Sequence, residues 1–270
     1  MGSGKEKKRK TNNDFSPRPK KLKTKKEGAR KGHDKENGRA DTSNGKKENG
    51  AALYPTASEQ LKFFIHHYQS ANRVQLSPLE LESFKDTCMV ELIQDQAENK
   101  RTLGDHLKAA FGSSWKDLLC RNQFKAGKVE PGHPALIVIS SSALRSLELL
   151  RELRLFTKEC PPAKLFSKHM KIDEQVSFLK NRVNIASGTP SRIKKLIDME
   201  ALGLSRLTVV VLDMQMDVKG YSLLTLPQVR EEVWDLYKSY FHERMVEGTL
   251  RMCLYGPLPE ITRTKKVVDD

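Results

Sequence analysis

Apolar residues follow two different spacings along this chain, and the change from one to the other falls near Gly132. Before that residue they recur at three- and four-residue steps, which is the period of a helix with one buried side. After it they form short, continuous, β-branched runs, which are typical of strands buried on both faces. The pattern therefore predicts a helical segment at residues 56–125 and a lobe of strands and helices at residues 126–260.

Five runs in the lobe predict strands. They are ALIVIS at 135–140, AKLFS at 163–167, VNIAS at 183–187, LTVVVLD at 207–213 and RMCLY at 251–255. Helical stretches are expected at 143–155, 173–180, 190–199 and 227–240. Strands that alternate with helices of this length predict right-handed crossovers and a parallel sheet. We therefore expect an α/β fold with one parallel-sheet lobe, and a short tail at 261–270.

Two helix starts can be located in the helical segment. Ser58 is expected to cap the first helix. The sequence Ser-Pro-Leu-Glu at 77–80 is a stronger signal, because it places Ser at the N-cap, Pro at the first helical position and Glu at the third. Apolar residues then recur at helical steps, so we expect one buried stripe made of Leu81, Phe84, Cys88 and Leu92. Shorter helical pieces are expected at 103–111 and 115–119.

The positive charge of the chain is concentrated near its start. The net charge is +14, and residues 1–50 hold 17 Lys+Arg and 7 Asp+Glu, so only +4 remains for the rest. With almost no large apolar residues, the tail at 1–55 is expected to be disordered. Its basic runs resemble nuclear-import signals and would also bind RNA phosphates without reading sequence. The residues concerned are Lys7, Lys8, Arg9, Lys10, Lys20, Lys21, Lys23, Lys25 and Lys26. The alternative is a tail that only keeps the protein soluble.

Several classes of protein are disfavoured by the composition. The four cysteines lie far apart, without a Cys-x-x-Cys pair or a His at ligand spacing, so we expect buried thiols and neither zinc nor disulfides. His66 and His67 are adjacent and point different ways on a helix, which disfavours a shared metal. No stretch reaches the roughly 18 apolar residues of a membrane span, and no signal peptide is present. We therefore expect a soluble protein of the nucleus or cytosol.

The loop at 186–192 has the most specific sequence among those expected at the carboxyl ends of the strands, where open parallel sheets bind ligands. Gly188 permits close approach of the backbone, Thr189 can cap the following helix, and Pro190 suits its first position. Free amides at that helix start, together with Arg192, would bind a phosphate. The alternative is a well-capped helix with an arginine on its solvent side.

This loop resembles the Thr-Pro-Gly-Arg motif of DEAD-box RNA helicases, which contacts the RNA backbone, with Ser191 in place of glycine. Three further landmarks resemble that family and lie in the same order. Ser140, Ser141 and Ser142 stand where a Pro-Thr-Arg sequence would be. LTVVVLDMQM is similar to the strand that ends in Asp-Glu-Ala-Asp, and RMCLYGPLP to the strand that ends in Ser-Ala-Thr. The resemblance implies a RecA-like lobe whose candidate RNA contacts are Ser140, Ser141, Ser142, Gly188, Thr189, Pro190 and Arg192.

The residues that would hydrolyse ATP are missing from this resemblance. No Gly-x-x-x-x-Gly-Lys-Ser/Thr sequence occurs to hold phosphates and Mg²⁺. Asp213 is a remnant of the nucleotide motif, but Met214 replaces the carboxylate that would orient water. No second helicase lobe is expected either. The sequence therefore predicts no catalytic residues, no metal and no cofactor. The alternative is an RNA-dependent NTPase with an unusual nucleotide site.

The tail, the helical segment and the degenerate lobe together resemble the Cms-one family, the ribosomal small-subunit homologue. The blocks SSALRSLELLRELRLF, KLFSKHMKIDEQVSFLKNRV and GTPSRIKKLI carry this resemblance, which spans about residues 56–259. It implies a non-catalytic, nucleolar assembly factor of early small-subunit pre-ribosomes. Its partners would be pre-rRNA and assembly proteins, with no membrane and no small-molecule substrate. A third hypothesis is an adaptor in which only the helical segment matters.

Overall fold

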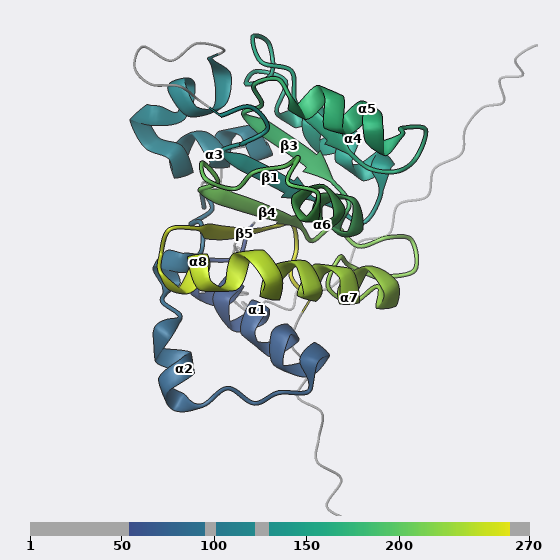
Figure 1. Ribbon diagram of the computed structural model, residues 1–270. Helices are drawn as coiled ribbons and strands as arrows, with labels where there is room; N and C mark the ends of the chain where they lie inside the picture. Colours follow the sequence, from purple (N-terminus) through teal and green to yellow (C-terminus); the bar gives the residue numbers. More distant parts are fainter. Residues whose placement is uncertain (1–53, 95–100, 122–129, 260–270) are drawn as a thin grey trace, which may run out of the picture. The chain divides into compact units, whose positions relative to one another are not determined.

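The computed structural model describes residues 54–94, 101–121 and 130–259 (Figure 1). Five strands within these ranges form one sheet in the order β2-β3-β1-β4-β5. They are β1 (Leu136–Ile139), β2 (Ala163–Leu165), β3 (Ile185–Gly188), β4 (Val209–Asp213) and β5 (Arg251–Tyr255). All four neighbouring pairs run parallel. The predicted α/β fold with a single parallel sheet is confirmed, and each strand lies within the run that predicted it or one residue beyond.

Helices surround the sheet on both faces. The α-helices are α1 (Ala57–Asn72), α2 (Pro78–Ser83), α3 (Leu103–Phe111), α4 (Ala143–Glu152), α5 (Ile172–Leu179), α6 (Pro190–Asp198), α7 (Pro227–Leu236) and α8 (His242–Val246). Short 3₁₀ turns lie at Asp86–Cys88 and Gly112–Ser114, and π-helical turns at Lys116–Cys120 and Tyr237–Phe241. The helix expected at 227–240 therefore continues further, through a π turn into α8.

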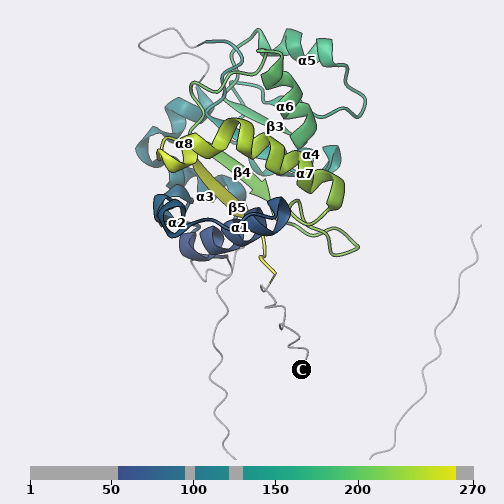
Figure 2. The same ribbon diagram turned by 60° about the horizontal axis from the view of Figure 1, so that its bottom comes forward.

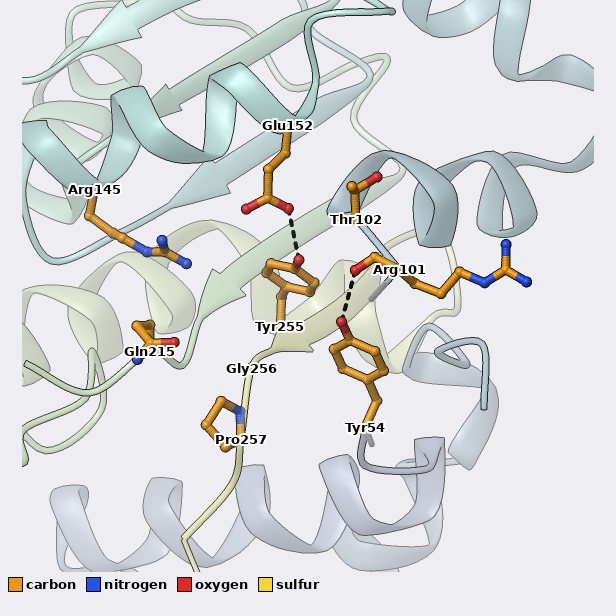
Figure 3. A pocket seen from close by; sticks show the side chains of 9 residues that line it. All are labelled: Tyr54, Arg101, Thr102, Arg145, Glu152, Gln215, Tyr255, Gly256 and Pro257. Atoms are coloured by element: carbon orange, nitrogen blue, oxygen red, sulfur yellow. Dashed lines mark hydrogen bonds between the residues drawn. The ribbon is translucent and has the colours of Figure 1, made fainter. Parts of the chain in front are cut away.

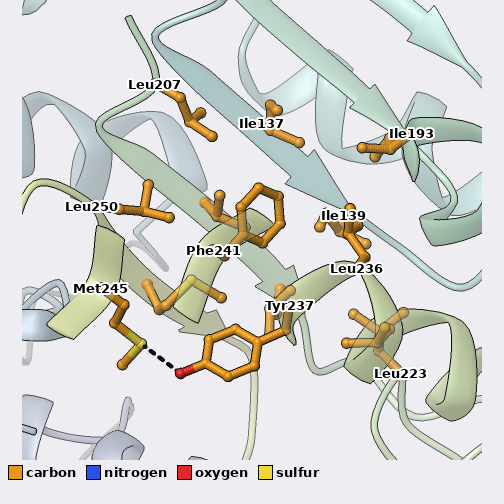
Figure 4. Packing of buried hydrophobic residues seen from close by; sticks show 14 of the residues in the cluster. Ile137, Ile139, Ile193, Leu207, Leu223, Leu236, Tyr237, Phe241, Met245 and Leu250 are labelled. Atoms are coloured by element: carbon orange, nitrogen blue, oxygen red, sulfur yellow. Dashed lines mark hydrogen bonds between the residues drawn. The ribbon is translucent and has the colours of Figure 1, made fainter. Parts of the chain in front are cut away.

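The sheet separates two hydrophobic clusters. Ile137 and Ile139 of β1 face a cluster that contains side chains of α1, α6 and α7, part of which Figure 4 shows. Leu136 and Val138 face the opposite cluster, which contains side chains of α3 and α4. Burial on both faces explains why the strand sequences are continuously apolar rather than alternating. Figures 1 and 2 both show α1 beside α7 on one side of this arrangement.

The first helix begins two residues earlier than expected. Thr56, not Ser58, is the N-cap of α1. Its hydroxyl accepts a hydrogen bond from the Glu59 amide at 3.3 Å, and the Glu59 carboxylate accepts one from the Thr56 amide at 2.8 Å. Because Glu59 lies three residues after Thr56, this pair forms the capping box, which Ser58 lacks a partner to form. The capping box predicted at Ser77 and Glu80 is confirmed.

The prediction of one apolar stripe along a single helix is wrong for Leu81, Phe84, Cys88 and Leu92. Helix α2 ends at Ser83, and Leu81 is 39% exposed. The chain beyond it turns toward the sheet, where the Val90 amide donates to the carbonyl of Met252 on β5 at 2.7 Å. Pairing with the edge of the sheet therefore replaces the helix, although Phe84, Cys88 and Leu92 are still buried.

The division at residues 125 and 126 lies outside the described residues, as do the basic runs of the tail and the segment at 261–270. The helical segment and the lobe as separate domains therefore stay a prediction. Cys88, Cys160 and Cys253 are buried and all four thiols are free, as expected. In the described ranges no helix has the length and apolar character needed to cross a membrane.

Candidate functional site

The carboxyl ends of β4 and β5 open onto a cavity of about 440 Å³ (Figure 3). It is lined by Tyr54, Arg101, Thr102, Arg145, Glu152, Gln215, Tyr255, Gly256 and Pro257. These residues come from the chain before α1, the start of α3, one side of α4, the end of β5 and the loops that follow β4 and β5. Open parallel sheets bind ligands at this edge, so the cavity is the candidate position for a nucleotide site.

Asp213, at the end of β4, is held by an arginine. Its side chain is only 1% exposed, and Arg145 of α4 donates to both carboxylate oxygens, from Nε and from a terminal nitrogen, each at 2.9 Å. The hydrogen bonds to Asp213 raise the pKa of Arg145, so the guanidinium stays charged. Arg145 also donates to Glu148 at 3.0 Å. Both oxygens that would face a metal ion are therefore already occupied by a cation of the protein.

The N-terminus of α3 is held by a carboxylate. Glu152, at the end of α4, accepts a hydrogen bond from the Leu103 amide at 2.9 Å and one from the Tyr255 hydroxyl at 2.8 Å. Figure 3 shows its carboxylate pointing toward Tyr255. Burial, and then the bond to Glu152, raise the pKa of Tyr255, which keeps the hydroxyl protonated and donating. A helix N-terminus attracts anions. Here the anion is supplied by the chain itself.

The three serines that follow β1 have different environments. Ser140 is fully buried, and its hydroxyl lies 2.7 Å from that of Ser146 and 3.1 Å from the carbonyl of Ser142. Ser142 is exposed, and its hydroxyl caps α4 by accepting from the Arg145 amide at 3.2 Å. Ser141 is half-buried between them. The structure therefore does not bring the three hydroxyls together on one surface, and RNA contact by them stays a prediction.

The loop between β3 and α6 is packed more closely than its sequence indicates. A Cβ atom on Gly188 would lie 1.9 Å from the carbonyl oxygen of Leu165, so glycine is required here by the neighbouring strand. Thr189 is the N-cap of α6 as expected, but its side chain makes no capping hydrogen bond. Pro190 is at the first position of the helix, as predicted, and is buried. Glycine at this position thus has a structural reason that requires no ligand.

Arg192 is engaged with the fold. One of its terminal nitrogens donates to the Gln175 side-chain oxygen at 3.0 Å. The amide nitrogen of Gln175 in turn donates to the carbonyls of Lys164 and Phe166, at 2.8 and 3.0 Å, on the outer edge of the sheet. Arg192 therefore supports the residue that covers the free edge of β2, instead of lying freely on the solvent side. Phosphate binding by this half-buried arginine stays a prediction.

Residues 3–255 match the sequence model of a family described as CMS1, U3-containing 90S pre-ribosomal complex subunit. The chain belongs to this family. Protein CMSS1 of Xenopus laevis is 31% identical over 204 residues, which are 74% of this chain and 68% of that protein. Protein CMSS1 of Homo sapiens is 30% identical over 201 residues, 74% of this chain and 65% of that protein. The predicted membership of the Cms-one family is confirmed.

A DEAD box protein from the hyperthermophile Methanococcus jannaschii is among the similar solved structures. The identity to it is 18% and the TM-score is 0.39, over 59% of this chain and 39% of that protein. In this CMS1 family member the parallel sheet itself, rather than that distant likeness, establishes the fold class.

Sequence reasoning did not find the two charged α4 residues that line the cavity of this CMS1 family member. Arg145, Glu148 and Glu152 are spaced by three and four residues, which places them on one side of a helix. That spacing was a visible signal. It could not reveal that the partners are Asp213 on β4 and the Leu103 amide, because these lie 68 and 49 residues away in the sequence. In the described part of the chain no group of His, Cys, Asp and Glu side chains could hold a metal ion.

Proposed function

We propose that this chain is a non-catalytic subunit of early small-subunit pre-ribosomes, which binds pre-rRNA and assembly proteins in the nucleolus. The description of its family as a subunit of a U3-containing 90S pre-ribosomal complex supports the assembly role. The charge of +10 on the first 50 residues supports nuclear import and contact with RNA phosphates.

The observation that carries the non-catalytic part of this proposal is that the charges lining the cavity are bonded to Asp213 and to the start of α3. Arg145 takes both oxygens of Asp213, and Glu152 takes the first amide of α3. A nucleotide would have to displace the guanidinium to bring a metal to Asp213. Its phosphates would also meet the Glu152 carboxylate at the helix start, where like charges repel. Together with the missing phosphate-binding sequence, these contacts disfavour ATP turnover.

A titration with a fluorescent ATP analogue, with and without single-stranded RNA, tests this. We expect no saturable binding at micromolar concentrations. Glu152→Gln is the matched variant, because it keeps the shape of the side chain and removes the repelling charge. Binding that appears only in this variant would support the account of the cavity. Saturable micromolar binding to the unchanged protein, lost in Asp213→Ala, would overturn it.

The alternative function is an RNA-dependent NTPase, and one observation favours it. The cavity of about 440 Å³ lies at the edge of the sheet where ligands of parallel folds bind. The same titration decides between the two, because an NTPase must bind nucleotide whether or not its residues are unusual.

The assembly role has its own test. The tagged full-length chain should co-sediment with pre-ribosomal particles, and its depletion should slow processing of small-subunit rRNA. Recovery only in the soluble fraction, with normal rRNA processing after depletion, would contradict the proposal.

A further inference from the structure

An aromatic and basic surface lies on α3 and the segment that follows it, on residues that do not line the cavity. Trp115 packs on the buried Phe156, with ring centroids 5.5 Å apart, and remains partly exposed. The ammonium groups of Lys108 and Lys116 lie 5.7 and 5.5 Å from the centre of the Trp115 ring. One indole is thus bordered by two cations that precede and follow it in the chain.

We propose that Trp115, Lys108 and Lys116, here called the Trp115 site, bind single-stranded RNA. A base would stack on the indole, and the two lysines would neutralise the phosphates on either side of it. This inference rests on the RNA binding in the proposed function and deepens it, because it names the part of the folded domain that makes the contact.

The local fold holds the indole in place. Helix α3 ends at Phe111, and Gly112, with a φ of +53°, turns the chain out of the helix. A π-helical turn follows Trp115, and within it Leu119 is fully buried in the core. Short π-helical segments often occur at functional sites. Because Leu119 and Phe156 anchor the segment on the core, little side-chain freedom remains to be lost when a base stacks on the indole.

Asp105 and Asp117, the acidic side chains of α3 and the segment that follows it, are both engaged. Asp105 accepts hydrogen bonds from the amide and hydroxyl of Thr102 at 3.2 and 2.8 Å, and its other oxygen forms an ion pair with Lys108 at 3.4 Å. Asp117 is paired with Arg121 at 2.8 Å. Because Asp105 is shared between Thr102 and Lys108, it offsets the charge of Lys108 only in part, and Asp117 is paired with Arg121 rather than with Lys116. The turn that carries Phe156 adds the exposed cations Arg154 and Lys158 and one exposed carboxylate, Glu159, so cations still outnumber carboxylates on this surface.

The chemistry favours RNA in single strands over other polyanions. A duplex hides the faces of its bases, so it would use the lysines but not the indole. An acidic peptide would likewise need only the cations. Stacking platforms flanked by basic side chains are the arrangement with which proteins bind single-stranded nucleic acid without reading its sequence.

The fluorescence of Trp115 provides a local probe. The chain has two tryptophans, and the other, Trp234, is 3% exposed in the opposite cluster. Titrating the full-length chain with an unlabelled 20-nucleotide single-stranded oligoribonucleotide should quench the emission of Trp115, and Trp115→Phe should abolish most of the quenching. The tail can bind RNA through its charge, but it contains no tryptophan and would not produce this signal.

Affinity is measured in parallel with the labelled oligoribonucleotide over a range of salt concentrations. Lys116→Ala should flatten the slope of log affinity against log salt by about 0.7, because one phosphate of the single strand is then no longer neutralised. Trp115→Ala should weaken binding about tenfold. Lys238→Ala is the matched control, because Lys238 is also exposed but lies on the π turn against the opposite cluster. Circular dichroism checks that each variant is folded. Lys116→Ala still tests the site if Trp115→Ala fails to fold.

The outcomes separate the two proposals. Quenching on RNA addition, with a greater effect of Lys116→Ala than of Lys238→Ala, supports the Trp115 site. RNA binding without a change in tryptophan emission, and with equal effects of the two lysine variants, overturns the site but leaves the proposed function intact. Absence of any RNA binding by the full-length chain overturns both. Equal quenching by duplex RNA would refute the preference for single strands.

Discussion

Removing Arg145 should destabilise the protein strongly, because it leaves the carboxylate of Asp213 without its cation. In Arg145→Met the apolar stem is kept, while two hydrogen bonds of 2.9 Å to a side chain that is 1% exposed are removed. Breaking a buried ion pair by removing one partner costs about 3–5 kcal/mol. With a urea m-value of roughly 2 kcal/mol per molar, the unfolding midpoint should fall by about 1.5–2.5 M.

The double variant Arg145→Met with Asp213→Leu provides the internal control. Replacing a buried ion pair by apolar side chains of similar size is often nearly neutral. The double variant should therefore be more stable than Arg145→Met alone. Glu148→Gln removes only the more exposed partner of Arg145, so it should change the free energy of unfolding by less than about 1 kcal/mol. Urea unfolding followed by tryptophan fluorescence measures all three.

The loss should also depend on pH. Burial raises the pKa of Asp213, and the hydrogen bonds from Arg145 oppose that rise. Without Arg145 the pKa of this carboxyl in the folded state lies further above its value in the unfolded state. Protonation then favours the folded state, so the variant recovers stability as the pH falls and loses it as the pH rises through the folded-state pKa. A loss below about 1 kcal/mol, or one that is equal at pH 5 and pH 7.5, would refute this reasoning.

Three further predictions concern the fold and the RNA loop. Thr56→Ala should cost about 1 kcal/mol in the free energy of unfolding and Ser58→Ala less than about 0.5 kcal/mol, because only Thr56 forms the capping box; equal losses in urea unfolding would contradict this. Gly188→Ala should lower the melting temperature, at a cost of about 1–3 kcal/mol, because its Cβ would meet the Leu165 carbonyl. An unchanged melting temperature would show that β2 can move aside. Arg192→Ala should lower stability by about 1–3 kcal/mol through the loss of its bond to Gln175. If Arg192 also binds phosphate, the salt dependence of RNA affinity should flatten by about one unit, and an unchanged slope would place the contact elsewhere.

The sequence determined the alternation of strands and helices. Continuous apolar runs such as LTVVVLD can be buried only between two layers, and helical stretches of suitable length separate them, so a parallel sheet was the consistent arrangement. Helix-start signals were also reliable where both residues of a capping box were present in the sequence. Ser77 with Glu80 forms a capping box. At the first helix the capping box is formed by Thr56, because Glu59 lies three residues after Thr56 and Ser58 has no such partner.

Periodicity misled where a longer-range contact was stronger. Leu81, Phe84, Cys88 and Leu92 have helical spacing, but the backbone near Val90 pairs with β5, more than 150 residues later. Spacing describes only which side of a helix a residue would occupy. It contains no information about a strand edge that becomes available when distant parts of the chain fold together.

The candidate site also has some features that the sequence reveals and others that only the folded structure reveals. Sequence alone identified membership of the Cms-one family and the absence of a Gly-x-x-x-x-Gly-Lys-Ser/Thr sequence, because each depends on residues that are neighbours in the chain or on a family pattern. That Asp213 is a remnant of a nucleotide motif stays a prediction. Only the tertiary structure decided that Arg145 holds Asp213, that Glu152 holds the start of α3, and that Arg192 supports the edge of β2. The physical reason is that a buried charged side chain is stable only when it is paired or hydrogen-bonded, so what it can bind depends on the groups that surround it. Those partners come from elements that are far apart in the sequence and meet only in the folded sheet.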